Sequence, residues 1–385
     1  MSVWRVLTED EVEPAEGLAL DEALMTSYGR ATGGTVPGVA ALRLYTYRSH
    51  AALVGRHQSL EAEVDLAACE RLGVGVGRRP TGGGAIIMGE GQLGVAVATR
   101  APVDCSPREL LQAFGAGVAA GLAELGIAAR FRGKNDLECG GRKIAGLGLH
   151  LDGDGALLFH ASVLADLDVD LLLDVLRIPG AKLAAHGAAR VQERITTVSR
   201  ELGRPVTGAD LRGPVRRGMA AALGVELRDD VPTATELDVA ALHAGRHRSP
   251  DWLHIAGGSA DTHASVLLRT PQGLLRIYAG VQGTALTSVM VTGDVAVLPP
   301  SVTRAEALLR WLPAEPDVIA DALRECVEPD VLGVGPDVLA AGVWAAARQA
   351  MERSGSLPVR LSGSCYFPDP AGAAPAEPLA VGHRA

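Results

Sequence analysis

The chain of 385 residues has few aromatic residues, almost no lysine and no long apolar run. Aromatic residues make up 3% of it, which argues against a platform for stacking nucleic-acid bases. The net charge of −9 argues against a non-specific binder of nucleic acid or anionic membranes. No run approaches the roughly 18 apolar residues of a membrane span, and the segment 1–16 is acidic, unlike a secretion signal. The sequence therefore predicts a folded, cytoplasmic protein that binds neither nucleic acid nor membrane.

Several common motifs are missing as well. The five cysteines are an odd number at scattered positions without a C-x-x-C pair, so neither a structural zinc site nor a disulfide framework is expected. The chain contains no G-x-x-x-x-G-K-[ST], no G-x-S-x-G and no H-E-x-x-H. The usual P-loop, serine-hydrolase and zincin chemistries therefore lack support.

Lysine is the rarest cation. Of the 36 basic residues only Lys134, Lys143 and Lys182 are lysine, and all three lie within one stretch of 49 residues. Where arginine has replaced nearly every other cation, a remaining lysine indicates a position that needs a compact, flexible ammonium group.

The hydrophobic pattern alternates between strands and helices and includes hairpins, which favours an α/β (α+β) fold with a mixed sheet covered by helices. A helix after Ser106 has a capping box with Glu109 and a buried stripe of Leu110, Phe114, Val118 and Leu122. Strands are expected at 42–47, 51–55, 85–88, 93–99, 143–151 and 156–164, with 85–88 and 93–99 as a hairpin. Further helices are expected at 17–28 (amphipathic), 61–72, 168–176, 180–189 and 207–223.

Length favours two domains, because one hydrophobic core rarely grows beyond about 250–300 residues. The pattern weakens over 229–251, a polar stretch with proline, and strands followed by helices resume from 252. We therefore expect a catalytic domain at 1–245, a small α/β accessory domain at 250–354 and a flexible tail at 355–385.

Two glycine-rich segments carry candidate chemistry. Residues 78–85 (Arg-Arg-Pro-Thr-Gly-Gly-Gly-Ala) combine backbone that a phosphate can approach with two guanidinium groups, the alternative being a flexible turn. Lys143 opens a strand between glycines, the alternative being a surface lysine at a strand edge. If a hairpin at 152–155 pairs Leu151 with Ala156, Lys143 and His160 share one sheet face, about 13 Å apart along the strand.

These segments, in this order, resemble the superfamily of lipoate ligases, octanoyltransferases and biotin ligases, and within it the lipoate–protein ligases. The resemblance covers roughly residues 3–200, and a weaker likeness to the accessory domain of longer ligases covers 252–350. The motifs that carry it are Leu18–Ala23, Val54–Gln58, Arg79–Ala85, Gly133–Asp136, Gly141–Gly146, Phe159–Ser162, Lys182–Gly187 and Arg194–Thr196.

The resemblance implies a biotin/lipoate ligase-like catalytic domain that uses ATP and Mg²⁺. Lipoate or octanoate would become an acyl-adenylate, and the acyl group would pass to a lysine of a lipoyl-domain acceptor, such as 2-oxoacid dehydrogenase E2 or glycine cleavage H protein. Lys143 would be catalytic and touch both acyl and phosphate oxygens. The other implied residues are Arg79, Gly84, Ala85, Ile86, Ile87, Asn135 and Asp136 for the nucleotide, Asp136 for the metal, and Gly83 and His160 for the acyl group.

Departures leave alternatives open. After the glycine loop such ligases usually continue with a His-Asp pair and an Asn, whereas this chain has Met88-Gly89-Glu90-Gly91-Gln92. A carrier-dependent octanoyl- or lipoyltransferase that works without ATP, with Cys139 as a thioester site, is one alternative, and a non-catalytic binder of an acyl-adenylate is another. A biotin ligase is disfavoured because its Gly-Arg-Gly-Arg-type loop is missing. Since acceptor lipoyl domains are often acidic, docking on this acidic chain requires a local basic patch.

Overall fold

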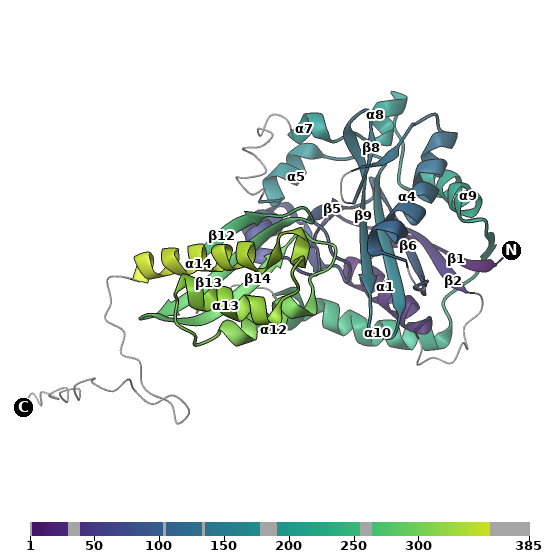
Figure 1. Ribbon diagram of the computed structural model, residues 1–385. Coiled ribbons are helices and arrows are strands. Elements are labelled where there is room, and N and C mark those ends of the chain that lie inside the picture. The colour runs from purple at the N-terminus through teal and green to yellow at the C-terminus, as the bar shows by residue number, and fades with distance from the viewer. Residues whose placement is uncertain are drawn as a thin grey trace, which may run out of the picture.

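The computed structural model describes residues 2–29, 39–102, 105–132, 135–177, 191–254 and 264–354. A mixed sheet has the strand order β11-β1-β2-β6-β10-β9-β8-β7, which confirms the predicted fold class (Figure 1). β1 is parallel to β2 and β11, and the other neighbours are antiparallel. The strands are β1 (Val3–Val12), β2 (Ala40–Tyr47), β6 (Gln92–Arg100), β7 (Arg130–Arg132), β8 (Asp136–Cys139), β9 (Arg142–Leu151), β10 (Ala156–Leu164) and β11 (Glu226–Asp229).

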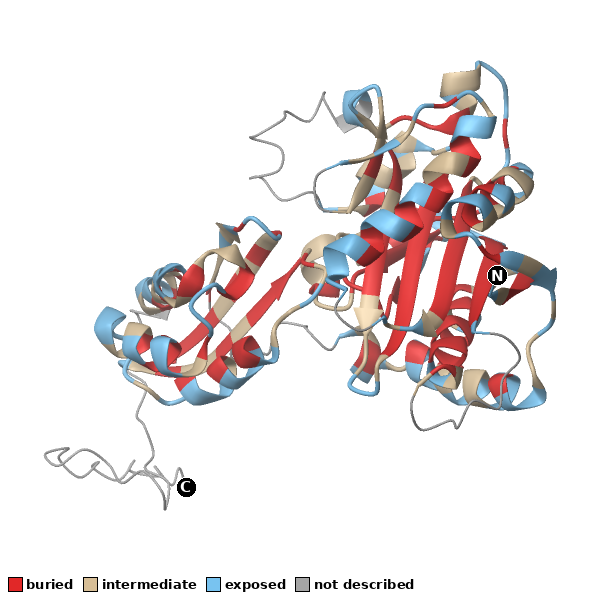
Figure 2. Ribbon diagram, turned by 45° about the vertical axis from the view of Figure 1, so that its right-hand side comes forward, coloured by how far each residue is buried: buried red, intermediate tan, exposed pale blue. Residues whose placement is uncertain are grey.

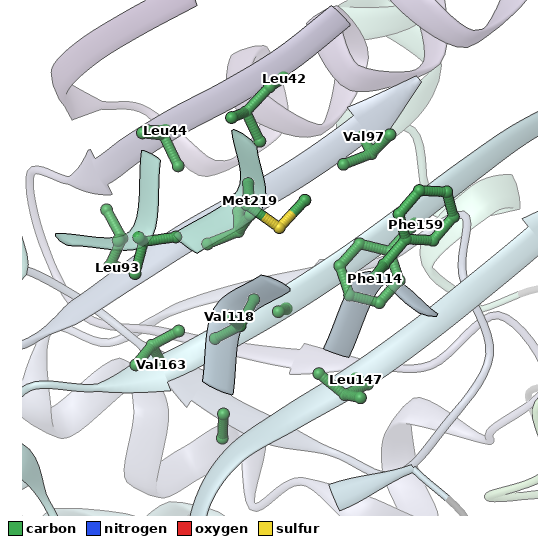
Figure 3. Close-up of a cluster of buried hydrophobic side chains, with 14 of the residues drawn as sticks. Leu42, Leu44, Leu93, Val97, Phe114, Val118, Leu147, Phe159, Val163 and Met219 are labelled. Carbon is green, nitrogen blue, oxygen red and sulfur yellow. The ribbon is translucent and has the colours of Figure 1, made fainter. Parts of the chain in front are cut away.

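Helices cover both faces of this sheet, so the central strand β10 is buried throughout (Figure 2). On one face, α4 (Pro107–Glu124) and α9 (Arg212–Leu223) pack against alternate residues of the strands. Figure 3 shows Phe114 of α4 beside Phe159 of β10, with Met219 of α9 in the same cluster. On the other face lies α1 (Pro14–Ser27), with α10 (Ala234–Arg248) packed on it. The predicted amphipathic helix at 17–28 is instead buried on nearly all sides over 17–25, because α10 covers its outer surface.

The capped helix confirms its prediction. Ser106 and Glu109 form the capping box at the start of α4, and the four residues of the expected stripe are all buried. Glycines let α4 and α9 approach closely, since a Cβ on Gly218 would lie 2.1 Å from the Gly121 nitrogen. This contact fixes the helical layer behind the sheet.

A second, small sheet corrects one predicted hairpin. Its order is β4 (Gly75–Arg78), β3 (Ala51–Val54) and β5 (Ile86–Met88). The prediction that 85–88 pairs with 93–99 is wrong: β5 pairs with β3, whereas β6 lies between β2 and β10. Residues 89–91 carry the chain from one sheet to the other, because both β5 and β6 find longer-range partners.

Several shorter helices lie between the strands in the sequence. The helix expected at 61–72 is divided into α2 (Leu60–Glu63) and α3 (Leu66–Leu72), because the Asp65 side chain accepts the Ala68 N–H and starts a new helix. α5 (Val169–Val175), α7 (Val191–Arg194) and α8 (Val198–Leu202) follow. The helix expected at 180–189 lies outside the described residues.

The C-terminal unit, drawn in green to yellow in Figure 1, has its own hydrophobic core, formed by residues 264–350. Its elements are β12 (Ala264–Arg269), β13 (Leu274–Gln282), β14 (Ala285–Gly293), α12 (Pro300–Leu309), α13 (Pro316–Cys326) and α14 (Gly335–Ser354). The weak stretch 229–251 contains α10, which has a capping box at Thr233 and packs on α1. α11 (Pro250–Leu253) follows it. The division into domains stays a prediction, and the expected tail lies outside the described residues.

Within the described part of the chain, no helix combines the length and apolar composition that crossing a membrane requires.

Candidate active site

A cavity of about 560 Å³ lies where the large sheet, the small sheet and the C-terminal unit meet. This volume is typical of a site for a small organic ligand. Its walls contain every predicted site residue except Gly83. The cavity lies on the α1 face of the sheet, where β9 and β10 present glycine, serine and histidine.

The register of β9 differs from its prediction by one residue. Leu151 faces Leu157, so Gly148 lies opposite His160. In an uninterrupted strand with this register, Lys143 would project to the face opposite His160, because side chains alternate along a strand.

A β-bulge at Ile144 returns Lys143 to the cavity. Glu138 of β8 faces Lys143, while the preceding residue of β8 faces Ala145, so Ile144 has no partner of its own. One extra residue reverses the alternation, and Lys143 lines the same cavity as His160. The predicted shared face is therefore found, but by a route that the prediction did not contain.

Two glycines of β9 make room on this face. A Cβ on Gly146 would lie 3.0 Å from Lys143 Nζ, so the lysine side chain folds back across this glycine. A Cβ on Gly148 would lie 2.9 Å from Thr81 Oγ1. Lys143 Nζ ends 2.7 Å from Asp136 Oδ1, and the two side chains are 32% and 33% exposed. A ligand can therefore reach both charges.

Asn135 joins β9 to the glycine loop, residues 82–84. Its Nδ2 donates to the Leu147 carbonyl at 3.0 Å, and the Leu147 N–H donates to the Asn135 carbonyl at 2.7 Å. A Cβ on Gly83 would lie 3.3 Å from the same Nδ2. Asn135 and Asp136 both line the cavity, whereas Gly133 and Lys134 lie outside the described residues.

Arg79 shapes the glycine loop from within. Its guanidinium donates to the carbonyls of Leu53 at 2.7 Å, Gly84 at 2.9 Å and Gly82 at 3.4 Å. Burial lowers the pKa of Arg79 to about 10, which leaves it charged at neutral pH. Arg79 thus brings one positive charge to the cavity wall and holds the loop in place.

Arg78 is not part of that wall, which corrects the expectation that both arginines face one anion. It is fully buried, burial lowers its pKa to about 10, and Trp252 Nε1 donates to its carbonyl at 3.1 Å. Its side chain donates to the carbonyls of Gly55, Arg56, Gln58, Trp252 and Leu253. Arg78 therefore attaches α11 to the small sheet.

The glycine loop contacts protein at two of its N–H groups. Gly82 donates to Leu149 O at 3.4 Å, and Gly83 donates to Val295 O of the C-terminal unit at 3.0 Å. Gly83 has φ +105°, which favours glycine. The predicted acyl-binding residue Gly83 thus lies behind the wall, whereas the predicted stretch Gly84–Ile87 lines the cavity.

His160 lies in a buried chain of hydrogen bonds. Its Nε2 is 3.1 Å from Asp21 Oδ2, and its Nδ1 is 3.1 Å from Thr81 Oγ1. The Arg43 guanidinium donates to the other oxygen of Asp21 at 2.8 Å. Burial alone would raise the pKa of Asp21, but Arg43 and His160 hold it below its usual value.

The rest of the cavity is largely apolar near the small sheet. Its walls there include Leu18 of α1, Leu53 of β3 and Met88 of β5, and Ser162 Oγ donates to Met88 Sδ at 2.8 Å. Tyr45 occupies the space above Gly94, where a Cβ would lie 2.5 Å from its ring. This wall suits a hydrocarbon chain, since each buried CH₂ contributes about 0.8 kcal/mol.

Sequence reasoning missed several wall residues. Arg269, Leu274 and Asp294 come from the C-terminal unit, and no local pattern marks a contact between segments so far apart. Arg194 also lines the cavity; the resemblance includes it but assigned it no role. Asp21, which lies behind the wall, has a signal that could have found it: Asp21 and Glu22 are carboxylates in an otherwise apolar run at 18–25, and a buried carboxylate must have a partner.

The protein could supply only some of the ligands of the implied Mg²⁺ ion, and water and substrate phosphates would supply the rest. In the described ranges, no three His, Cys, Asp or Glu side chains group to hold a metal ion. Asp136, Glu138 and Asp294 nevertheless line the cavity. Because Mg²⁺ is often held by one or two carboxylates together with water and substrate phosphates, a carboxylate such as Asp136 is a sufficient protein ligand.

Cys139, the residue that the thioester alternative needs, lies beside the cavity and is not part of its wall. Its Sγ is 3.7 Å from Glu201 Oε2, and burial raises the pKa of the thiol. The same Glu201 accepts from Arg142 at 2.7 Å and from the Thr196 hydroxyl.

These features define a class of protein: a mixed-sheet domain with a ligand cavity that has one polar and one apolar wall. Lys143, the one lysine among the described residues, lines this cavity. Residues 13–220 match the model of the lipoyl protein ligase A/B catalytic domain. This match covers more than half of the chain, which therefore belongs to the lipoyl protein ligase A/B family. The chain is accordingly an enzyme of the lipoate ligase and acyltransferase type.

Relatives include both activities. Octanoyltransferase LipM of Symbiobacterium thermophilum is 34% identical over 249 residues, which cover 58% of this chain and 88% of the relative. A structure from a study of a bi-partite lipoate protein ligase and its E2 lipoyl domain from Thermoplasma acidophilum is 26% identical with a TM-score of 0.59, over 68% of this chain and 99% of that one. A lipoate-protein ligase A structure bound with ATP is 25% identical with a TM-score of 0.56, over 65% and 97%.

Proposed function

We propose that this chain activates lipoate or octanoate with ATP and transfers the acyl group to a lysine of an acceptor lipoyl domain. In the first step a carboxylate oxygen attacks the α-phosphorus of ATP, and pyrophosphate leaves. In the second step the acceptor amine attacks the acyl carbonyl, gives up a proton, and AMP leaves. The observation that carries the proposal is Lys143, whose side chain lines the same cavity as Gly84–Ile87 and whose ammonium lies 2.7 Å from Asp136 Oδ1.

The chemistry of the first step explains the need for a lysine there. A carboxylate and a phosphate repel each other, and a fixed ammonium offsets this repulsion while it stabilises charge on the transferring group. A compact ammonium can serve oxygens of both reactants, whereas the planar fork of arginine suits one bidentate partner. Arg79, Asn135 and the backbone of Gly84–Ile87 line the same cavity and would hold the nucleotide. Asp136 would hold Mg²⁺, which neutralises charge on the departing pyrophosphate.

The acyl chain would lie against the apolar wall of Leu18, Leu53 and Met88, with His160 beside it. Lys143 would then contact the carboxyl end of that chain and the phosphate. This arrangement gives the predicted acyl-binding residue His160 a place at the boundary between the apolar and polar walls.

Acceptor docking is supported by a local basic patch. Arg130 and Arg132 are exposed on β7, at the edge of the large sheet. They line a second hollow that shares Glu138 with the main cavity. We propose that carboxylates around the target lysine of an acidic acceptor contact this patch, despite the net charge of −9. The lipoylation system of T. acidophilum likewise comprises a lipoate protein ligase and its E2 lipoyl domain.

One further activity has a specific observation in its favour: transfer of an octanoyl group from acyl carrier protein without ATP. The octanoyltransferase LipM of S. thermophilum, at 34% identity, favours it. The place of Cys139 outside the cavity wall favours the ligase.

Pyrophosphate release distinguishes these activities. We expect the protein to release pyrophosphate from ATP on addition of lipoate or octanoate, and not on addition of biotin. Absence of release, together with octanoylation of a lipoyl domain from octanoyl-acyl carrier protein, would establish the transferase instead. Tight binding of an acyl-adenylate without either turnover would establish a non-catalytic binder.

Lys143→Ala tests the catalytic assignment. Adenylate formation should be lost while the fold persists, since a partly exposed ion pair contributes only about 0–1 kcal/mol. Arg100→Ala, which removes an exposed cation at the end of β6, is the control and should keep full activity. A Lys143→Ala protein that forms adenylate at the wild-type rate would refute the role of Lys143.

A further inference from the structure

We propose that Asp21, His160 and Thr81 form one positioning unit that couples the acyl-facing wall of the cavity to the glycine loop. The proposal rests on the proposed function and extends it to two residues, Asp21 and Thr81, that do not line the cavity. Both act through His160, which does.

The three side chains form a continuous buried chain between distant elements. Asp21 of α1 and Thr81 are fully buried, and His160 of β10 is 7% exposed. Each ring nitrogen of His160 has one partner at 3.1 Å, Asp21 on one side and Thr81 on the other. Arg43 of β2 donates to Asp21 at 2.8 Å and fixes the far end.

The donors and acceptors assign a direction to this chain. A carboxylate only accepts, and Asp21 stays ionised beside Arg43. His160 Nε2 therefore carries the proton and donates to Asp21. Nδ1 either accepts from the Thr81 hydroxyl or, when it also carries a proton, donates to the hydroxyl oxygen, so Thr81 is bound in both cases. A carboxylate that orients a histidine in this way is a common positioning device.

The position of Thr81 fixes the position of the glycine loop that follows it. Its carbonyl accepts from Arg56 N at 2.9 Å, and Gly82 and Gly83, the next two residues, donate to Leu149 O and Val295 O. The continuous stretch of wall residues 84–88 begins only three residues after Thr81. A displacement of Thr81 therefore displaces the nucleotide wall, and a displacement of His160 moves the acyl wall.

Hydrogen exchange in the ligand-free protein tests the unit without reference to activity. Thr81→Val removes the hydroxyl at similar size, and Asp21→Asn removes the carboxylate. We expect amide exchange at 82–87 to accelerate about fivefold to tenfold in each, the ratio for one lost buried hydrogen bond. Thr81→Ser keeps a hydroxyl and should recover most of the protection.

Matched controls come from two other hydrogen-bonded pairs. Thr46→Val removes a buried hydroxyl that lies 2.9 Å from Asp10 Oδ1, and Glu236→Gln removes a buried carboxylate paired with Arg5. Neither should change exchange at 82–87. If Asp21→Asn does not fold, Thr81→Val and Thr81→Ser carry the test.

Ligand titrations show whether the unit couples the two walls. We expect Thr81→Val and Asp21→Asn each to lower the binding affinity for both octanoate and ATP. The double variant should bind each ligand no more weakly than the more affected single variant does. A folded Thr81→Val with wild-type loop exchange, or additive losses in the double variant, would overturn the proposal. If the wild-type protein binds neither ligand, the proposed function fails, while the exchange measurement still decides whether the unit exists.

Discussion

Replacing Gly146 by alanine should lower activity while leaving stability unchanged or higher. The added methyl would lie 3.0 Å from Lys143 Nζ and 3.2 Å from Cε, closer than ordinary contact. Because these atoms end a flexible side chain, the ammonium moves and the backbone stays. Alanine in place of glycine in a strand then stabilises by about 0.5–1 kcal/mol. Displacement of the ammonium by a few tenths of an ångström or more should reduce adenylate formation about tenfold to a hundredfold.

Two measurements together distinguish a displaced Lys143 ammonium from a destabilised fold. They are the rate of ATP–pyrophosphate exchange with octanoate and the midpoint of urea unfolding. Gly148→Ala is the matched control on the same strand. Its methyl would lie 3.1 Å from the Gly82 carbonyl, which is backbone, so both rate and midpoint should fall. A folded Gly146→Ala with the wild-type exchange rate would show that the position of Lys143 over Gly146 is not needed. A fall in its midpoint as large as that of Gly148→Ala would place the conflict in the strand itself.

Three further predictions address other parts of the molecule. Glu201→Gln should lower kcat for adenylation several-fold and leave KM for ATP nearly unchanged. Glu201 accepts a hydrogen bond from the Thr196 hydroxyl, and the Thr196 N–H donates to the Lys143 carbonyl, so Glu201 helps to position Lys143. Steady-state pyrophosphate release measures both constants, and a change in KM alone contradicts the prediction. Reversing the charges of Arg130 and Arg132 to glutamate should slow transfer to an acidic lipoyl domain and spare adenylate formation, and equal loss in both steps contradicts the docking assignment. Between about pH 6.5 and 4 the free energy of unfolding should fall as the pH falls. Burial, with Arg56 nearby, lowers the pKa of His57 and His150 to about 4, so in this range the unfolded chain binds protons that the folded chain does not. Urea midpoints that stay level over this range contradict the prediction.

Local signals in the sequence predicted local structure well. The capping box at Ser106 and the stripe of α4 depend on residues three or four positions apart, and both are confirmed. The hairpin after β9 is also confirmed, but its register differs. Gly155 has φ +80°, and the Asp152 N–H donates to the Ala156 carbonyl, which makes 153–155 a three-residue loop. The sequence marks such a turn but does not distinguish a loop of three residues from one of four.

Signals that depend on distant partners could not be found in the same way. Nothing local shows that β5 leaves β6 to pair with β3, or that Val295 accepts a hydrogen bond from the glycine loop. The bulge at Ile144 exists because β8 pairs with β9 on both sides of it. Without that bulge, the observed register would turn Lys143 away from His160, so the two errors of the prediction cancelled each other.

The glycines of the site show why a motif can indicate the right place for an incomplete reason. The triple glycine predicts backbone open to a phosphate, yet a Cβ on Gly82 would lie 2.1 Å from the Ala296 carbonyl, and Gly83 donates to Val295. At Gly82 glycine is required by contact with the C-terminal unit, and at Gly83 it is favoured by the φ of +105°. On β9, Gly146 admits the lysine side chain and Gly148 admits Thr81. The large sheet, the glycine loop and the C-terminal unit can thus approach one another around the cavity because these positions have no side chain. A bound phosphate would contact mainly the wall residues from Gly84 onward.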